Sequence, residues 1–204
     1  GPTDPIYDPV LKKTLTKPSH AKARAYGYSL ANSVIEAFQA GDFKQSPKPS
    51  ITVHSTEIEL GIENFMLSLG TLLGVIDSDP KFSLMPPFVR YLSEVAFIQI
   101  GDASITGIPG ELYPEIAVGG IENPIGADYV IAPQEVPHLR SQFSDKLNLM
   151  VNLANDSIGY IIPKSEWDED APWIYGEKEE TYGEVVSLGP NTAPVIHENL
   201  LELI

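Results

Sequence analysis

Glu111 is the residue whose place in the sequence is best suited to chemistry. It follows the apolar stretch 98–108 and the dipeptide Pro109-Gly110, which together predict a buried strand that ends in a sharp turn. Gly110 permits backbone angles that other residues avoid. The residues after it have the composition of a helix start, where backbone N–H groups favour negative charge. Such a carboxylate either caps the helix or holds a metal ion or proton, and spacing alone leaves both interpretations open.

A second group of polar residues ends another apolar stretch. The strand predicted over 147–153 is followed by Asn155, Asp156 and, after a short apolar segment, Tyr160. Ligand sites often gather at strand ends, so these residues and Glu111 form a candidate site rim. The alternative is a turn in which Asn and Asp make only local hydrogen bonds.

The four histidines do not form a metal motif by themselves. His20, His54, His138 and His197 lie in neither an H-x-H nor an H-E-x-x-H pattern. We expect His197 on the surface of the last helix or at an interface. His54 is either a ligand or an ordinary half-buried, hydrogen-bonded residue. The chain has no cysteine, which excludes disulfides, thiolate zinc sites and cysteine nucleophiles.

Periodicity predicts the elements that position these residues. Ser19 is a plausible N-cap for a helix that ends at Gly41, with an apolar stripe that includes Leu30 and Val34. We expect residues 1–18 to form an extended arm. Further expected elements are a short helix over 65–73, strands on both sides of a hairpin at 101–102, a short strand over 128–132, and a last helix from residue 192.

The segment 51–60 is rich in β-formers, but its apolar residues change parity. Ile51 and Val53 occupy one alternating set, whereas Ile58 and Leu60 occupy the other. This pattern predicts a bulge or a strand whose apolar side switches faces. The mix of strands and helices indicates an α/β fold, a layered mixed-sheet domain of α+β character with helices packed outside.

Composition and charge describe a globular chain. Of 204 residues, 43% are hydrophobic and 20% charged, with no apolar run near the roughly 18 residues of a membrane span. The net charge of −15 argues against nucleic-acid binding, because an acidic surface repels phosphates. Residues 1–50 carry +3 and residues 51–204 carry −18. The acidity serves solubility or, in a sharper interpretation, lets the basic N-terminal segment dock on an acidic surface.

The segment 164–184 is both acidic and aromatic. It has eight acidic residues and two lysines, and it contains Trp167 and Trp173. The two indoles either form the rim of an acyl-chain pocket or anchor the loop in the core, as buried aromatic residues commonly do.

Several of these segments, in this order, resemble the C-terminal part of the catalytic domain of the neutral/alkaline non-lysosomal ceramidases and their bacterial relatives. The resemblance covers most of the chain. The segments that carry it are 25–38, 52–63, 100–103 (Ile-Gly-Asp-Ala), 108–112 (Ile-Pro-Gly-Glu-Leu), 153–163 (Leu-Ala-Asn-Asp-Ser-Ile-Gly-Tyr-Ile-Ile-Pro) and 188–190 (Leu-Gly-Pro).

The resemblance implies a zinc-dependent amide hydrolase that cleaves the N-acyl bond of a ceramide-like lipid. It implies Glu111 as a metal ligand and Tyr160 as its tyrosine partner, with Ser157 at a position where some relatives carry a tyrosine. The family's two zinc histidines would lie before residue 1, so residues 19–204 would be the C-terminal portion of a catalytic domain that is incomplete without its N-terminal portion. The run 112–116 departs from the family pattern, so the expected substrate is an N-acyl lipid or a related compound and not specifically ceramide.

Further expectations follow from the same resemblance. The partners would be that N-terminal portion, on a separate or cleaved chain, and a lipid-like small molecule, with peripheral membrane contact. The expected compartment is extracellular or periplasmic, and the cytoplasm stays open. The competing hypothesis is a non-catalytic structural or interaction protein that retains the fold.

Overall fold

The computed structural model describes residues 4–41, 48, 50–76, 80–143, 147–179 and 182–204. The chain divides into two compact units, Gly1–Lys48 and Pro49–Ile204. The sequence placed the boundary after residue 18. The structure places it after residue 48, because the first long helix packs on the strand that precedes it.

The first unit is a hairpin followed by a helix. Strands β1 (Ile6–Asp8) and β2 (Lys13–Leu15) pair antiparallel, and α1 spans His20–Ala40. The expected extended arm is therefore wrong over these strands, where the chain folds back on itself. The predicted ends of the helix are confirmed, with Ser19 as N-cap and Gly41 as C-cap.

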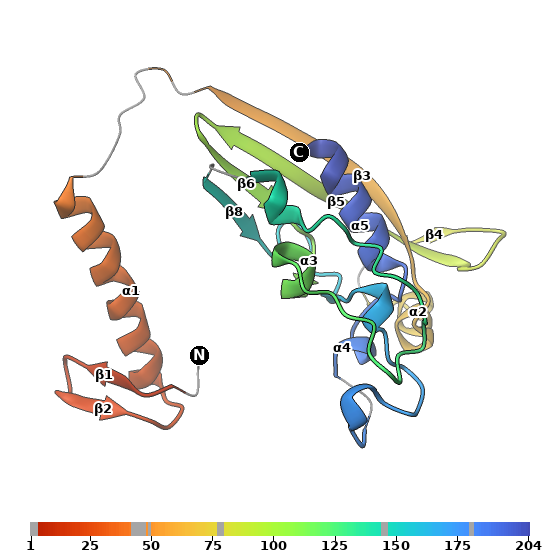
Figure 1. Ribbon diagram of the computed structural model, residues 1–204, viewed down its shortest axis with the longest axis horizontal. Coiled ribbons are helices and arrows are strands. Elements are labelled where there is room, and N and C mark those ends of the chain that lie inside the picture. Colours follow the sequence, from red (N-terminus) through yellow and green to blue (C-terminus); the bar gives the residue numbers. More distant parts are fainter. Residues whose placement is uncertain (1–3, 42–47, 49, 77–79, 144–146, 180–181) are drawn as a thin grey trace. The chain divides into compact units, whose positions relative to one another are not determined.

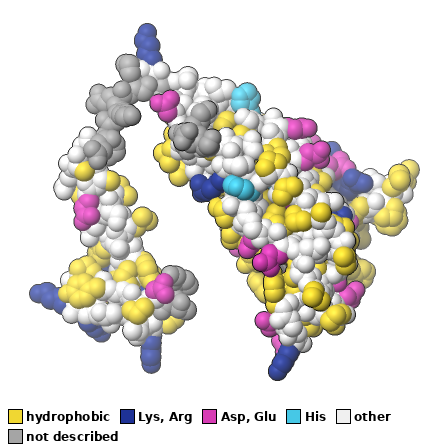
Figure 2. Space-filling view, in the orientation of Figure 1, with side chains coloured by type: hydrophobic (Ala, Val, Ile, Leu, Met, Phe, Trp, Pro, Cys, Tyr) yellow, Lys and Arg dark blue, Asp and Glu magenta, His cyan; other side chains and the backbone are white. Residues whose placement is uncertain are grey.

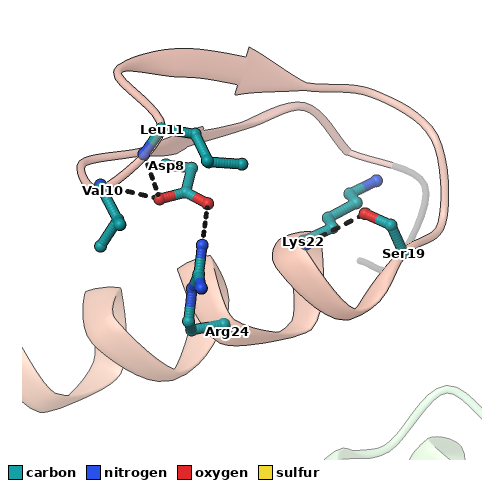
Figure 3. A network of polar contacts seen from close by, with 6 residues as sticks. All are labelled: Asp8, Val10, Leu11, Ser19, Lys22 and Arg24. Atoms are coloured by element: carbon teal, nitrogen blue, oxygen red, sulfur yellow. Dashed lines mark hydrogen bonds and ion pairs between the residues drawn. The ribbon is translucent and has the colours of Figure 1, made fainter.

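Asp8 joins the hairpin to the helix (Figure 3). Its carboxylate accepts hydrogen bonds from the backbone N–H groups of Val10 (2.8 Å) and Leu11 (3.1 Å) and from the Arg24 guanidinium (3.0 Å). Burial opposes ionisation, but these hydrogen bonds outweigh it and keep the pKa of Asp8 below its usual value. The hairpin turn is thus stabilised by a side chain that sequence periodicity does not reveal.

The second unit is built on a mixed sheet with the strand order β3-β5-β6-β8 (Figure 1). β3 (Ile51–Gly61), β5 (Val89–Ile100) and β6 (Ala103–Gly107) pair antiparallel in succession, and β8 (Leu147–Val151) joins β6 in parallel. The short strand β4 (Lys81–Phe82) forms a hairpin with the start of β5. The predicted hairpin between β5 and β6 is confirmed.

One face of this sheet is covered by α5 (Thr192–Leu203), which packs against β3 and β5. Ile58 and Val95 of the sheet and Ile196 and Leu200 of the helix are fully or almost fully buried there. Burial of four such side chains is worth several kcal/mol before the entropy cost of ordering them. The unit is a layered α/β domain with the helix outside the sheet.

The opposite face of the sheet is open. β3 pairs with β5 without a slip from Ile51↔Ile100 to Gly61↔Arg90, which excludes the first of the two predicted alternatives, a bulge. The other predicted alternative, a strand whose apolar side switches faces, is confirmed: Ile58 and Leu60 point into the core, whereas Ile51 and Val53 lie on the open face. Cross-strand neighbours extend this outer apolar face, which we define as Ile51, Val53, Ile98, Ile100, Ile105, Leu147, Leu149 and Val151.

The remaining elements surround the sheet. They are α2 (Phe65–Leu72), β7 (Glu111–Leu112), α3 (Pro114–Val118), the 3₁₀ turns Leu139–Phe143, Lys164–Glu166 and Ile174–Gly176, β9 (Tyr160–Ile161) and α4 (Tyr182–Val185). The strand expected over 128–132 is wrong, because that stretch has no regular structure. Within the described ranges, no helix is both long and apolar enough to cross a membrane.

Candidate functional site

The candidate site lies where two chain segments pair for a second time. β6 and β8 run parallel, and after a short interruption the same two segments pair again as β7 and β9. Between the two pairs, the N–H of Ile158 donates to the carbonyl of Pro109 at 3.0 Å. In the second pair Glu111 lies directly opposite Tyr160. The two residues predicted as metal ligands, 49 positions apart, are thus cross-strand neighbours.

Two glycines allow this close approach. A Cβ on Gly110 would lie 2.5 Å from the carbonyl oxygen of Gly159, and a Cβ on Gly159 would lie 1.8 Å from that of Val186. Gly159 also has φ +89°, which L side chains rarely adopt. Gly110 has no positive φ. It is therefore required for space, and not for the unusual backbone angles that the sequence suggested.

The Glu111 carboxylate acts on the hydroxyl of Tyr160. Its negative charge, then burial of the phenol, then the hydrogen bond between the two side chains all raise the pKa of Tyr160. Tyr160 is therefore protonated at neutral pH and can donate to the carboxylate. This arrangement offers a hydrogen-bonded acid and phenol, or two oxygen donors for a cation once the phenol gives up its proton.

Two further tyrosines flank Tyr160 and were not predicted as site residues. The rings of Tyr113 and Tyr182 each meet it edge-on, with centroids 6.0 Å apart. Burial, followed by the charge of Glu184, raises the pKa of Tyr113 to about 12. Tyr113 lies two residues after Glu111, which is a signal that sequence analysis could have used. Tyr182 comes from a distant segment, and no spacing rule identifies it.

Glu111 is not a helix cap. It belongs to β7, and the following helix begins at Pro114 with Tyr113 as its N-cap and Glu115 as the acid of its first turn. The capping interpretation of Glu111 is therefore wrong. The Pro-Gly dipeptide is followed by a second short strand before the helix starts.

Asp156 has a positioning role between the loop and the sheet. It accepts hydrogen bonds from the hydroxyls of Tyr91 (3.0 Å) and Ser93 (2.8 Å) and from the N–H of Ser157 (2.8 Å). The local bond to Ser157 is the turn contact that the sequence allowed for, and the two bonds to β5 were not foreseen. Together they fix the loop that leads to Tyr160.

A pocket of about 430 Å³ opens beside this loop. Its walls combine α2, the end of β3 and the loop, and they are mainly apolar. The lining residues are Ile62, Leu67, Thr71, Ile76, Tyr91, Asp156, Ser157, Ile158, Gly159, Val186 and Leu188. Ser157, the alternative ligand position, is exposed at this pocket.

The two tryptophans have different environments. Trp167 is 2% exposed, and its indole N–H donates to Glu169, so it anchors the loop in the core. Trp173 is half-buried and lines a pocket of about 500 Å³ together with Pro124, Ile125 and Tyr175. Neither Glu111 nor Tyr160 lines that pocket. The structure therefore does not bring the predicted rim residues together with the predicted ligands.

The histidines are dispersed. His54 is exposed on β3, and His197 is buried on α5 with its ring against the carbonyl of Pro137 (2.9 Å), which corrects the expected surface position. Among the residues that the structure describes, no three His, Asp or Glu side chains gather in a way that could hold a metal ion. The Glu111–Tyr160 pair accordingly offers two ligands and no histidine.

Comparison with models of protein families, with curated proteins and with solved structures found no match for this chain.

Proposed function

We propose that this chain is part of a zinc-dependent hydrolase of the ceramidase-like type, which cleaves the amide bond of an N-acyl lipid. The observation that carries the proposal is the pairing of Glu111 with Tyr160. The resemblance chose these two residues from the sequence, and they lie opposite each other on paired strands. Two residues 49 positions apart have no local reason to meet.

The donor chemistry of the pair fits zinc as two of four ligands. A carboxylate and a phenolic oxygen suit a catalytic zinc site that also uses imidazoles and keeps one position open. When bound, zinc would polarise the amide carbonyl and acidify a water molecule. Glu111 would hold the phenol of Tyr160 in place, and the edge-on ring of Tyr182 would limit the directions in which that phenol can turn.

The missing histidines would come from an N-terminal portion of the same catalytic domain. The outer apolar face supports such a partner, because soluble proteins rarely leave contiguous apolar surface of this extent uncovered. Leu147, Leu149 and Val151 of the edge strand are between 43% and 62% exposed there. A further layer packed on this face would give a domain of three layers, with the sheet between α5 and the added layer.

The pocket beside the Asp156 loop supports a lipid-like substrate. It is largely apolar, and the loop that forms one wall leads directly to Tyr160. An acyl chain held there would lie along the segment that positions the Glu111–Tyr160 pair. Asp156 and Ser157 supply the polar groups at this wall.

The test is to produce this chain together with any polypeptide that its gene encodes before Gly1. Zinc content and hydrolysis of a fluorogenic N-acyl amide are then measured for Glu111→Gln, Tyr160→Phe and the unsubstituted protein. We expect both variants to lose zinc and at least about tenfold in activity, since even loss of an outer-shell partner of a metal ligand costs about that much. Glu115→Gln and Tyr182→Phe are matched controls outside the ligand pair. Activity that does not depend on Glu111 would contradict the assignment.

The second candidate is a non-catalytic interaction protein with the same fold. It is favoured by the outer apolar face, combined with the lack of a three-ligand metal group in the described ranges. The two candidates differ in one measurement. An interaction protein would bind its partner through the outer face, so that Leu149→Asp abolishes binding, but the complex would contain no zinc.

A further inference from the structure

Two uncharged apolar segments lie side by side in the second unit. The first comprises α2 and the residues that follow it, since no charged residue occurs over 64–76. The second is the β4–β5 hairpin loop, since none occurs over 82–89. We define the α2–hairpin patch as Phe65, Met66, Phe82, Leu84, Met85 and Phe88, all at least 60% exposed.

The two segments are neighbours in space. A groove of about 400 Å³ separates them and is lined by Phe65 and Ser68 from α2 and by Pro86 and Phe88 from the hairpin. Glu63 also lines it, and its carboxylate accepts hydrogen bonds from Asn191. The N–H of Ser83 donates to the carbonyl of Phe88 at 2.9 Å, which closes the loop and holds its apolar tip outward. Figure 1 shows the hairpin extending away from the main sheet, with α2 near its base.

The shape of the patch favours a lipid surface as its occupant. The side chain of Leu84, at the tip, is fully exposed, and hydrophobic atoms gather at the end of this projection (Figure 2). The outer apolar face lies on a sheet and suits a partner with a flat surface. The α2–hairpin patch instead ends in a projecting, uncharged tip, which does not suit such a partner. It does match the interfacial region of a bilayer, which accepts apolar side chains to a depth of about 5–10 Å.

Charge selects the kind of lipid. Basic residues flank the loop, but each is paired: Lys81 lies 3.8 Å from Glu57 and 3.7 Å from Glu59, and Arg90 lies 3.2 Å from Glu59. Both basic side chains at the base of the hairpin are thus paired with carboxylates. The chain as a whole carries a net charge of −15. Anionic headgroups would be repelled, whereas neutral headgroups would not.

We propose that the α2–hairpin patch docks this chain on bilayers of neutral lipid by inserting its apolar tip among the headgroups. The inference goes beyond the proposed hydrolase and is independent of it, because neither Glu111 nor Tyr160 belongs to the patch. If Glu111→Gln still docks on vesicles and a patch variant does not, docking is independent of the proposed zinc ligands. Failure of one proposal can then be told from failure of the other.

The experiment is co-sedimentation of the chain with vesicles of phosphatidylcholine. Leu84→Asp is compared with Val130→Asp, which places the same charge on another aliphatic residue that is 88% exposed. We expect Leu84→Asp to lower the partition coefficient about tenfold or more, because a charge must then enter the interface, and Val130→Asp to leave it unchanged. Binding should not change when salt is added, since the contact is apolar.

A second readout reports insertion directly. Met85→Trp places an indole in the loop, and its emission should shift to shorter wavelength when phosphatidylcholine vesicles are added. Equal binding of Leu84→Asp and the unsubstituted chain would overturn the proposal. So would preferential, salt-sensitive binding to phosphatidylserine vesicles. Self-association without lipid that Leu84→Asp abolishes, measured by sedimentation velocity, would instead identify the patch as an interface between two copies.

Discussion

The carboxylate of Glu111 and the hydroxyl of Tyr160 face each other across the parallel β7–β9 pair, and the first raises the pKa of the second. The same two chain segments already pair in parallel before this point, as β6 and β8, and this earlier pairing brings Glu111 opposite Tyr160. The pairing of the two strands fixes the separation of the Glu111 and Tyr160 backbones. A fixed backbone separation would suit the metal ligation that we propose for the two residues.

The first prediction concerns this pair. Replacing Glu111 by Gln removes the negative charge that is the largest cause of the raised pKa of Tyr160, so that pKa should fall towards its ordinary value near 10. NMR titration with tyrosine labelled at Cζ measures it, and Tyr160→Phe assigns the signal. Glu115→Gln is the control, because Glu115 acts on Tyr113 and is not among the causes at Tyr160. A fall of the same size in both variants would show that the effect is general.

The second prediction tests the glycine that places Tyr160. Gly159→Ala should destabilise the protein by about 3 kcal/mol or more, because the new methyl group would overlap the carbonyl of Val186 in addition to straining the backbone. Gly120 has a similar positive φ of +104° but open space around it, so Gly120→Ala should cost only about 1–2 kcal/mol. Urea unfolding measures both. Equal losses would mean that backbone strain alone decides the effect.

The third prediction separates the two tryptophans. Trp167→Ala should cost about 3–5 kcal/mol of unfolding free energy, as expected for a large core side chain. Trp173→Ala should cost about 1–2 kcal/mol, because that side chain is only half-buried. Chemical denaturation gives both values. If Trp173 also contacts an acyl chain, its variant would lose substrate affinity, and unchanged affinity would argue against a rim role.

The fourth prediction concerns pH. Burial, followed by the charges of Glu115, Glu122 and Glu135, raises the pKa of Glu166 above 4.5, although a hydrogen bond from the Glu122 N–H opposes the shift. The folded protein therefore keeps this proton to a higher pH than the unfolded chain does. The stability that the proton contributes is present below about pH 4.5 and is lost as pH rises through the raised pKa.

Glu166→Gln mimics the protonated side chain and can keep the hydrogen bond to Glu122. The variant should therefore be more stable than the unsubstituted protein at about pH 7 and equally stable at about pH 4, by urea unfolding at each pH. Glu198→Gln, on an exposed position of α5, is the control and should have little effect. A destabilised Glu166→Gln at pH 7 would show that the charged form has a partner.

Much of the fold could be predicted from periodicity and from residues with special backbone preferences. Ser19 and Gly41 set the ends of α1, and a glycine-containing turn set the β5–β6 hairpin. The β1–β2 hairpin could not be predicted in this way. Its turn depends on Asp8, whose partner Arg24 lies sixteen residues later on the helix.

The sequence by itself determined the ends of α1 and the β5–β6 hairpin, because caps and turns depend on local residue preferences. The resemblance, also a property of the sequence, singled out Glu111 and Tyr160. The tertiary structure decided three other matters. It made Glu111 a strand residue opposite Tyr160, it buried Trp167, and it divided the apolar residues of β3 between a core face and an open face. Each depends on contacts between distant segments, and register and burial are set by which segments pair and pack, which a local pattern cannot specify.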